Sequence, residues 1–458
     1  MRIRHIKAKG LFNLFDHSVP LNLNERITII HGANGLGKTA LLRLVNGFFK
    51  SMYSELEAIP FTSFEIGFDN GSQISIQKHR EKSKGKGTAS RKRAGFIFNY
   101  VSQSGKQEEY QFDPDVFYQK DARWRHIVMD LQGYIPGLQR LPNGTWRYAP
   151  TGETLSIYEA LGRFQDSLPA YFREALGDVE VQPEWFSKIK KSINVHFIQT
   201  QRLVSYNERL QRHASREAPT VTPAVQVYSE EITEAIKNTL TEYAELSQAL
   251  DSTFPERLMS QNREENLPGD ELRERLADLE VKRQELKAIG LLEEKPHVRF
   301  EIPDRLEPMT ENVLSVYVKD VERKLKVFDV IASKIDLMRQ IVDDHFLYKR
   351  LSMNRDKGFL FTNKDGHLLT PIQLSSGEQN ELVLLYELLF KVRHGSLILI
   401  DEPEISLHVA WQQQFLSDLQ QIIRLSPFDV LIATHAPLII NDRWDLTVEL
   451  QGPPEQKK

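Results

Sequence analysis

Cysteine is absent from the chain of 458 residues. Disulfide bonds, thiolate metal sites and a cysteine nucleophile are therefore excluded. Long apolar runs are missing as well, since none approaches the roughly 20 residues that a transmembrane helix requires. The N-terminal residues alternate as in a strand and lack the pattern of a signal peptide, so we expect a cytoplasmic protein with no membrane partner.

The chain also has little excess of either charge. Lysine and arginine number 59 and aspartate and glutamate 63, which gives a formal net charge of −4. No global basic field attracts nucleic acid, so any such binding must come from a local patch. The basic segment 78–93 is one candidate. We favour a solvated hairpin loop there, and the alternative is a docking site for a phosphate backbone or an acidic protein.

A glycine-rich loop is present between an expected buried strand, Ile27–Ile30, and an expected helix. Its sequence at 32–39 is Gly-Ala-Asn-Gly-Leu-Gly-Lys-Thr. Glycines let the backbone wrap a pyrophosphate, and the helix N-terminus adds a favourable dipole. Lys38 is expected to bridge the β- and γ-phosphates and Thr39 to place its hydroxyl on Mg²⁺. The predicted ATP-binding residues of this loop are Asn34, Gly35, Gly37, Lys38 and Thr39.

Two further buried strands end in polar residues. Leu397–Ile400 leads into Asp401 and Glu402, and Val430–Ala433 is followed closely by His435. Ligands of open α/β sheets bind at the carboxyl ends of the strands. We expect Asp401 to hold Mg²⁺ through its water shell and Glu402 to be the catalytic base that activates water. His435 is expected to contact the γ-phosphate and the attacking water.

A Leu-Ser-Ser-Gly-Glu-Gln motif at 374–379 precedes a strongly periodic helix. With the three preceding motifs, it resembles the signature loop of the ABC-type ATPase heads of the Rad50, SMC, RecF and OLD group. The resemblance implies a homodimer that sandwiches ATP, in which Ser375 and Gly377 contact the γ-phosphate held by the opposite subunit. Glu378 is assigned to the same ATP site. Residues 401–408 resemble the Walker B strand and following loop of the OLD-like branch, and 406–408 would cross the dimer interface.

The family pattern also implies a glutamine that reaches the metal and the attacking water. Gln199, directly after the strand-like run Val195–Ile198, is our prediction for this catalytic and metal-binding residue. Gln201 is the alternative. For both, an ordinary polar loop residue is the simpler structural interpretation.

These motifs predict an α/β fold, namely an ABC-type ATPase head with a mixed sheet and a largely helical, partly coiled-coil insertion. We expect the N-terminal part of the head at 1–205, with a mixed insertion at about 113–190. The helical insertion is expected at 206–348 and the C-terminal part of the head at 349–458.

A heptad supports the insertion, because five apolar residues seven positions apart lie in an expected helix at about 310–348. These residues are Leu314, Val321, Phe328, Ile335 and Val342. The expected partner stripe is Leu272, Leu276, Leu279 and Leu286. A projecting coiled coil and an ordinary packed helical layer are both compatible with this spacing.

Two features of related ATPases are absent here, which narrows the choice among members of this group. A Rad50 zinc hook needs a Cys-x-x-Cys pair, and an OLD nuclease carries a Toprim domain after the ATPase, whereas few residues follow His435. The chain most resembles the ATPase subunit of the PARIS anti-phage defence system. That resemblance implies a homo-hexamer, a Toprim-type nuclease effector and an acidic, DNA-mimicking phage protein that triggers its release. Segment 78–93 is a candidate contact for this trigger.

The alternative function is a RecF- or Rad50-like ATPase that closes on DNA during repair or maintenance, and the basic segment favours it. A transporter ATPase subunit is a distant third, because such subunits lack long helical insertions like the one expected at 228–348.

Overall fold

A computed structural model gives the structure of the chain as two compact units. The first comprises residues 1–222 and 391–458, and the second comprises 223–390. The described residues are 1–79, 95–112, 131, 134, 135, 137–141, 146–148, 153–155, 160, 164, 183–198, 204–206, 221–260, 267–293 and 307–452.

A five-stranded parallel sheet forms the centre of the first unit. Its strand order is β11, β17, β18, β3 and β19, with each neighbouring pair parallel. The strands are β11 (Val195–Ile198), β17 (Leu397–Asp401), β18 (Asp429–Thr434), β3 (Ile27–His31) and β19 (Thr447–Glu449). The central strands are nearly continuous apolar runs because both faces of a parallel sheet are covered.

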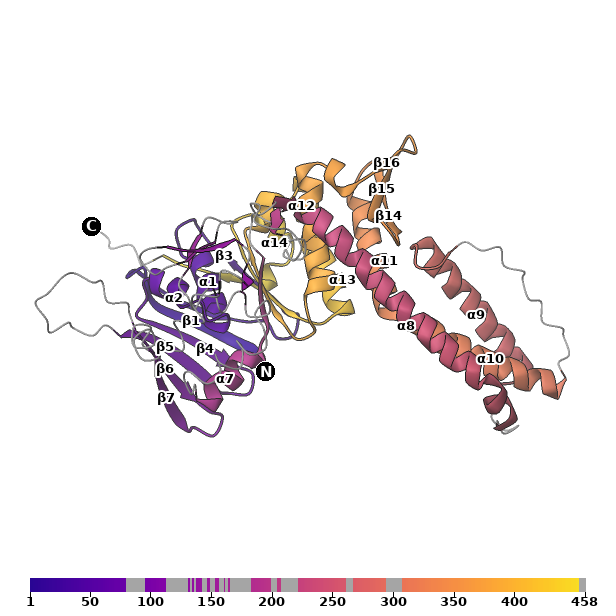
Figure 1. The fold of residues 1–458 in the computed structure, drawn as a ribbon. Helices are drawn as coiled ribbons and strands as arrows, with labels where there is room; N and C mark the ends of the chain where they lie inside the picture. The colour runs from indigo at the N-terminus through magenta and orange to yellow at the C-terminus, as the bar shows by residue number, and fades with distance from the viewer. Residues whose placement is uncertain are drawn as a thin grey trace, which may run out of the picture. The chain divides into compact units, whose positions relative to one another are not determined.

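An antiparallel sheet of six strands accompanies it, in the order β2, β1, β4, β5, β6 and β7 (Figure 1). These are β1 (Ile3–Leu11), β2 (Phe15–Pro20), β4 (Ser63–Phe68), β5 (Gln73–His79), β6 (Gly95–Val101) and β7 (Gln107–Phe112). The two sheets share one hydrophobic core, which includes the apolar side of helix α1 (Lys38–Phe49). Phe48 and Phe98 pack there against Phe186 with ring centroids 6.0 and 4.8 Å away. Full burial of such a ring contributes about 1.5–3 kcal/mol.

Shorter elements complete the first unit. They are α2 (Tyr53–Ala58), β8 (Leu138–Arg140), β9 (Trp146–Tyr148), β10 (Glu153–Leu155), α7 (Glu184–Ser192), β12 (Val204–Tyr206), β13 (Val221–Pro223), η6 (Pro403–Ser406), α13 (Val409–Leu425), α14 (Pro437–Ile440) and η7 (Trp444–Leu446). Together with the parallel strands, they make the mixed α/β fold that the sequence predicts.

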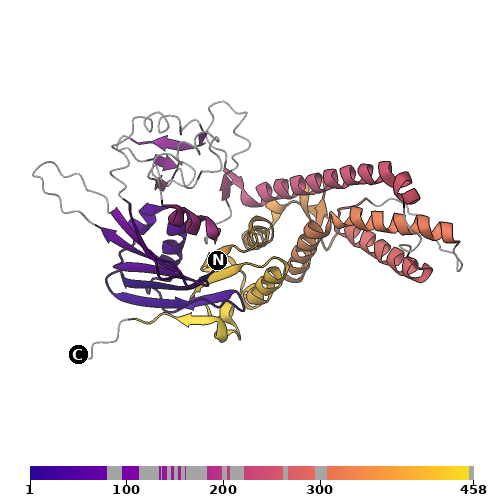
Figure 2. The ribbon, with the colours of Figure 1, turned by 90° about the horizontal axis from the view of Figure 1, so that it is seen from below.

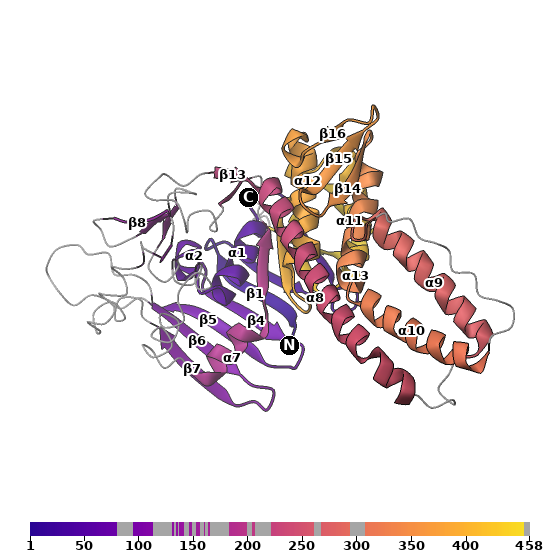
Figure 3. The ribbon, with the colours of Figure 1, turned by 45° about the vertical axis from the view of Figure 1, so that its right-hand side comes forward.

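The second unit is mainly helical, with a small antiparallel sheet (Figures 1 and 2). Its helices are α8 (Ala224–Ser260), α9 (Gly269–Ala288), α10 (Pro308–Lys326), α11 (Asp329–His345), η4 (Pro371–Gln373), α12 (Ser376–Tyr386) and the π-helical turn η5 (Glu387–Lys391). The strands are β14 (Lys349–Asn354), β15 (Gly358–Asn363) and β16 (Leu368–Leu369). Helix α10 packs on both α8 and α9, and Figure 3 shows α9 and α10 side by side.

The helix expected at about 310–348 is in fact two helices, α10 and α11. They meet at Val327 and Phe328, where the Phe328 N–H donates to the Leu325 carbonyl at 3.1 Å. This tighter turn interrupts the α-helical ladder, while the Phe328 ring stays fully buried beside Tyr243 of α8. All five heptad residues are buried across the break. The heptad therefore identifies the buried side but not the change of direction.

The division into compact units assigns β14–β16 and α12 to the helical unit. The expected boundaries at 205/206 and 348/349, which concern parts of an ATPase head, stay predictions. No helix in the described parts of the chain has the length and apolar character to cross a membrane.

Candidate functional site

The predicted phosphate-binding loop joins β3 to α1 and has a conformation that glycine permits. Gly35 and Gly37 have φ values of +87° and +90°. A Cβ atom at Gly37 would lie 2.6 Å from Leu11 Cδ2, which excludes a larger residue without rearrangement. Asn34 and Gly35 are exposed at the outer part of the loop. The backbone here is open to an incoming ligand.

The ammonium group of Lys38 lies against the carbonyls of its own loop. Its Nζ donates to the Gly32 and Ala33 oxygens at 2.7 and 3.1 Å, and the residue is 6% exposed. A lysine held at this point can exchange carbonyl partners for phosphate oxygens with a small displacement. Charge-assisted bonds to phosphate are stronger than bonds to neutral carbonyls.

A histidine that sequence reasoning missed supports the same loop. His17 of β2 is 5% exposed, and its Nε2 lies 2.7 Å from the Leu36 carbonyl oxygen. A carbonyl only accepts, so Nε2 carries the proton. The ring also stacks on Phe15 at 5.6 Å. Nothing in the sequence pattern separates His17 from an ordinary strand residue, because its role depends on the pairing of β2 beside the loop.

Thr39 and Asp401 meet at the carboxyl end of the parallel sheet. The Thr39 hydroxyl donates to Asp401 Oδ1 at 2.9 Å. Hydroxyl, carboxylate and water oxygens are the ligands that Mg²⁺ prefers, and it usually keeps several waters. The two residues therefore fit Mg²⁺, with Thr39 as a direct ligand and Asp401 acting through a bound water. No cluster of three His, Cys, Asp or Glu side chains that could hold a metal occurs in the described part of the chain, so phosphate and water oxygens would complete the shell.

The surroundings of Asp401 destabilise its ionised form. Burial raises the pKa of its carboxyl to about 6, against the lowering effect of the Thr39 hydrogen bond. The nearby charges of Glu402 and Glu404 raise that pKa further, whereas Lys38 lowers it. A divalent cation would remove the conflict among these carboxylates.

Glu402 has an unusual backbone conformation. Its φ of +46° and ψ of +57° are left-handed, a region that non-glycine residues seldom occupy. Its N–H donates to the Ala433 carbonyl at 2.8 Å, which holds the turn against β18. Such strain persists where the surroundings enforce it and is frequent at active sites.

His435 follows β18 and is paired with a residue to which sequence reasoning gave no role. Its Nδ1 lies 2.9 Å from Glu404 Oε1, and its backbone N–H donates to the same oxygen at 3.0 Å. The Glu404 side chain is only 7% exposed, whereas that of His435 is 44% exposed. The signal in the sequence was the third carboxylate of Asp-Glu-Pro-Glu, but only the fold shows its partner.

The signature residues lie in the second unit. Ser375 caps α12, and its N–H and hydroxyl donate to Glu378 Oε2 at 2.8 and 2.9 Å. Lys349 Nζ donates to both Glu378 oxygens at 2.6 and 2.7 Å. Burial would raise the pKa of Glu378, but the hydrogen bonds from Lys349 and Ser375 keep it below its ordinary value. Glu378 therefore has a local capping role, and its contact with ATP stays a prediction, as do those of Ser375 and Gly377.

Two other predictions concern residues that the structure leaves undescribed. Gln199 and its alternative Gln201 both lie outside the described residues, as do residues 80–93 of the basic segment. Lys78, at the start of that segment, donates to the carbonyls of Glu57 and Ile59 at 2.9 and 2.5 Å. This lysine is thus anchored in the first unit.

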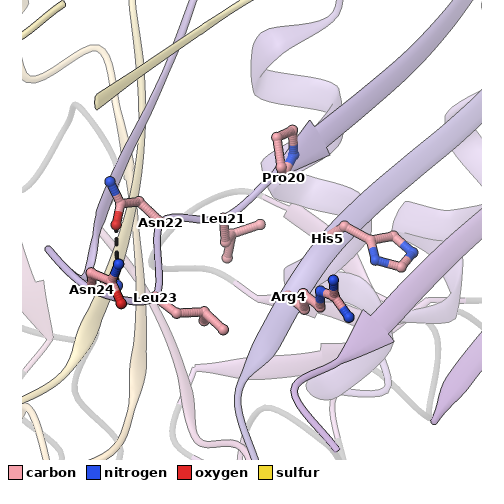
Figure 4. A pocket seen from close by; sticks show the side chains of 7 residues that line it. All are labelled: Arg4, His5, Pro20, Leu21, Asn22, Leu23 and Asn24. Carbon is pink, nitrogen blue, oxygen red and sulfur yellow. Dashed lines mark hydrogen bonds between the residues drawn. The ribbon is translucent and has the colours of Figure 1, made fainter. Parts of the chain in front are cut away.

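A shallow cavity of about 640 Å³ opens beside β1 and the end of β2 (Figure 4). Its lining residues are Arg4, His5, Pro20, Leu21, Asn22, Leu23 and Asn24. The Asn22 side chain accepts from the Asn24 N–H at 3.1 Å, and His5 lies 3.1 Å from Glu65. These polar groups stabilise the turn and the strand, and none of the predicted site residues lines the cavity.

The raised pKa of Asp401 predicts a pH-dependent stability in metal-free protein. The folded state holds this proton more tightly than the unfolded state, so stability falls as pH rises from about 4 through about 6. Asp401→Asn should raise the unfolding temperature at about pH 7.5, and less at about pH 5, in scanning calorimetry with a chelator. The same variant should lose the stabilisation that Mg²⁺ and ATP give the parent.

Asp365→Asn, in an exposed turn of the second unit, is the control. An Asp401→Asn variant that is destabilised at the higher pH, or gains equally at both, would contradict the assignment.

Comparison with known proteins adds one family match. Residues 215–441, just under half of the chain, match a family described as "AAA domain, putative AbiEii toxin, Type IV TA system". The matched range contains the signature motif, Asp401, Glu402 and His435, but it excludes the phosphate-binding loop.

Solved structures of SMC heads align along most of the chain. The Smc head with an extended coiled coil bound to the C-terminal domain of ScpA, from Pyrococcus furiosus, is 12% identical, with 96% of this chain and 91% of that chain covered and a TM-score of 0.31. The SMC head from Thermotoga maritima is 8% identical, with 96% of this chain and 93% of that chain covered and a TM-score of 0.33. A SmcHead bound to the C-winged helix domain of ScpA is 11% identical, with 96% of this chain and 91% of that chain covered and a TM-score of 0.32. Residues 215–441 are, by the family match alone, similar in sequence to an AAA-type ATPase domain.

Proposed function

We propose that the protein is an ABC-type ATPase that binds ATP with Mg²⁺ and hydrolyses it to ADP and phosphate. The observation that carries the proposal is the hydrogen bond between Thr39 and Asp401. It joins the phosphate-binding loop to the carboxylate strand and brings together the hydroxyl that would bind Mg²⁺ directly and the carboxylate that would hold it through the water shell. Lys38 lies at the same loop, with its ammonium against two carbonyls.

Each side chain has a separate task in this proposal. Lys38 and the N-terminus of α1 bind the phosphates, and Thr39 and Asp401 hold Mg²⁺, which neutralises phosphate charge. Glu402 accepts the proton of the attacking water, and His435 contacts the γ-phosphate. Gln199 is proposed to reach the metal and that water.

We propose further that ATP lies between two copies of the chain. Ser375 is exposed at the N-terminus of α12, while Glu378 is drawn inward by Lys349. This arrangement leaves the Ser375 hydroxyl and the Gly377 backbone near the surface and neutralises the one acidic group of the loop. A signature loop of this kind suits a γ-phosphate presented by the other copy.

The proposed biological role is a sensor and scaffold in bacterial anti-phage defence. In that role ATP-bound oligomers, up to a homo-hexamer, hold a Toprim-type nuclease and release it when an acidic phage protein is detected. Support comes from the sequence resemblance to the PARIS ATPase subunit. The matching family description also names a toxin–antitoxin system, which is compatible with control of a toxic partner.

A RecF- or Rad50-like ATPase that binds DNA is the second candidate, and the cluster Arg91, Lys92 and Arg93 favours it. DNA binding that weakens steeply with salt and is lost when these three charges are neutralised would support it. Hydrolysis that DNA leaves unchanged would argue against it.

Lys38→Ala should abolish ATP hydrolysis. Removal of the ammonium eliminates charge compensation at the phosphates, and we expect a loss of about 10²-fold or more in turnover. Phosphate release and nucleotide binding measure the effect. Lys106→Ala, a surface lysine paired with Glu108 at 3.0 Å, is the matched control. Unchanged hydrolysis by Lys38→Ala would contradict the assignment of the loop.

Glu402→Gln should retain ATP binding and slow turnover by about 10²–10⁴-fold, because the amide cannot accept the proton of water. The ATP-bound dimer should then accumulate, which light scattering after size exclusion would detect. Glu184→Gln, at a surface carboxylate that is 82% exposed, is the control. Rapid hydrolysis by Glu402→Gln would assign the base elsewhere.

The defence role predicts a stable complex with the product of the adjacent gene. Co-expression followed by size measurement should give one particle that contains both chains, and the pair should confer phage resistance. Resistance should be lost with Lys38→Ala. A chain that stays alone and gives no protection would remove this role while leaving the ATPase assignment intact.

A further inference from the structure

The carboxylate of Glu404 has an unusual set of contacts for a residue outside the predicted site. Two nitrogens of one residue lie close to a single oxygen, since the backbone N–H of His435 donates to Oε1 at 3.0 Å and Nδ1 forms an ion-pair contact with Oε1 at 2.9 Å. Oε2 is buried, and no hydrogen-bond donor in the described part of the chain reaches it. The carboxylate is thus committed to His435.

This contact determines which nitrogen of the imidazole carries the proton. A carboxylate oxygen that also accepts a backbone N–H acts as an acceptor, so Nδ1 must be the donor. Nε2, on the other side of the ring, is then left for a ligand. The contact of Nδ1 with this oxygen also restricts rotation of the ring about its side-chain torsions.

The position of Glu404 is itself supported by the fold. It lies in η6, directly after the left-handed turn at Glu402. Gln412 of α13 is 8% exposed, and its Nε2 donates to the Glu404 and Leu407 carbonyls at 3.1 and 3.2 Å. The same short segment therefore carries Glu404 and leads into residues 406–408.

We propose that Glu404 is a positioning residue that fixes the Nδ1–H form and the orientation of His435, so that Nε2 is presented to the nucleotide. The proposal rests on the ATPase function proposed above. It also makes the segment after Glu402 a link between His435 and the loop expected at the dimer interface. Groups that orient a functional histidine in this way typically change activity by about 10–100-fold when removed.

Which nitrogen of the His435 ring carries the proton can be measured without any nucleotide. In protein with ¹⁵N-labelled histidine, the His435 signals are identified by their loss in His435→Gln. The neutral ring should carry its proton on Nδ1 in the parent. Glu404→Ala should shift it to Nε2, the form that free histidine prefers. Glu404→Gln should retain the Nδ1–H form, because the backbone N–H of His435 orients the amide oxygen toward the ring.

Kinetics then separate positioning from a general structural effect. Glu404→Ala should lower kcat by about 10–100-fold with nucleotide affinity changed by less than about threefold, and Glu404→Gln should recover most of the rate. In a His435→Ala background, Glu404→Ala should cause no further loss, because the partner through which it acts is gone. Unfolding temperatures of all variants show whether the fold is retained.

Two results would overturn the proposal. One is an unchanged Nδ1–H form in Glu404→Ala. The other is an equal loss of kcat from Glu404→Ala in the presence and absence of His435. A parent protein that hydrolyses no ATP would contradict the ATPase function instead, and the histidine spectra would still decide whether Glu404 positions the ring.

Discussion

The hydrogen bond from Thr39 to Asp401 joins residues 362 positions apart in the chain. It exists because β3 and β17 flank β18 in one parallel sheet, so that their carboxyl ends share an edge. The glycine-rich loop after β3 and the carboxylate of Asp401 at the end of β17 therefore lie at the same edge of the sheet. A shift of one strand by a single residue would separate the two oxygens and turn buried side chains outward.

The signature loop is held by contacts within the second unit. Tyr228 of α8 donates to Glu387 at 2.7 Å, and Tyr386 of α12 donates to Glu231 at 3.1 Å. The two tyrosine rings stack at 4.5 Å. A displacement of α12 would have to break these bonds or move α8 with it. In the proposed dimer, a movement of the signature loop on binding ATP would therefore be transmitted through α12 to α8.

The parts of this structure that the sequence predicts are those encoded by local pattern. The apolar runs at 27–30, 397–400 and 430–433 are buried strands, and the polar residues after them meet at one edge. The heptad identifies buried residues for the same reason. Local pattern could not identify the turn at Phe328, the support that His17 gives the loop, or the partner of Glu404. Each of these depends on which distant segment packs beside it.

Three neighbouring carboxylates determine the charge balance of the site. Asp401, Glu402 and Glu404 lie within four positions, and the fold buries the first and the last in part or almost fully. Burial raises the pKa of Asp401 most, and the like charges of Glu402 and Glu404 raise it further because they increase the free energy of the ionised state. Glu404 accepts a hydrogen bond from the backbone N–H of His435 and lies 2.9 Å from its Nδ1, and the backbone of Glu402 is left-handed. Asp401 accepts a hydrogen bond from the neutral hydroxyl of Thr39, and the nearby charge of Lys38 also lowers its pKa. The carboxylate of Asp401, beside the hydroxyl oxygen of Thr39, is the position at which we propose Mg²⁺.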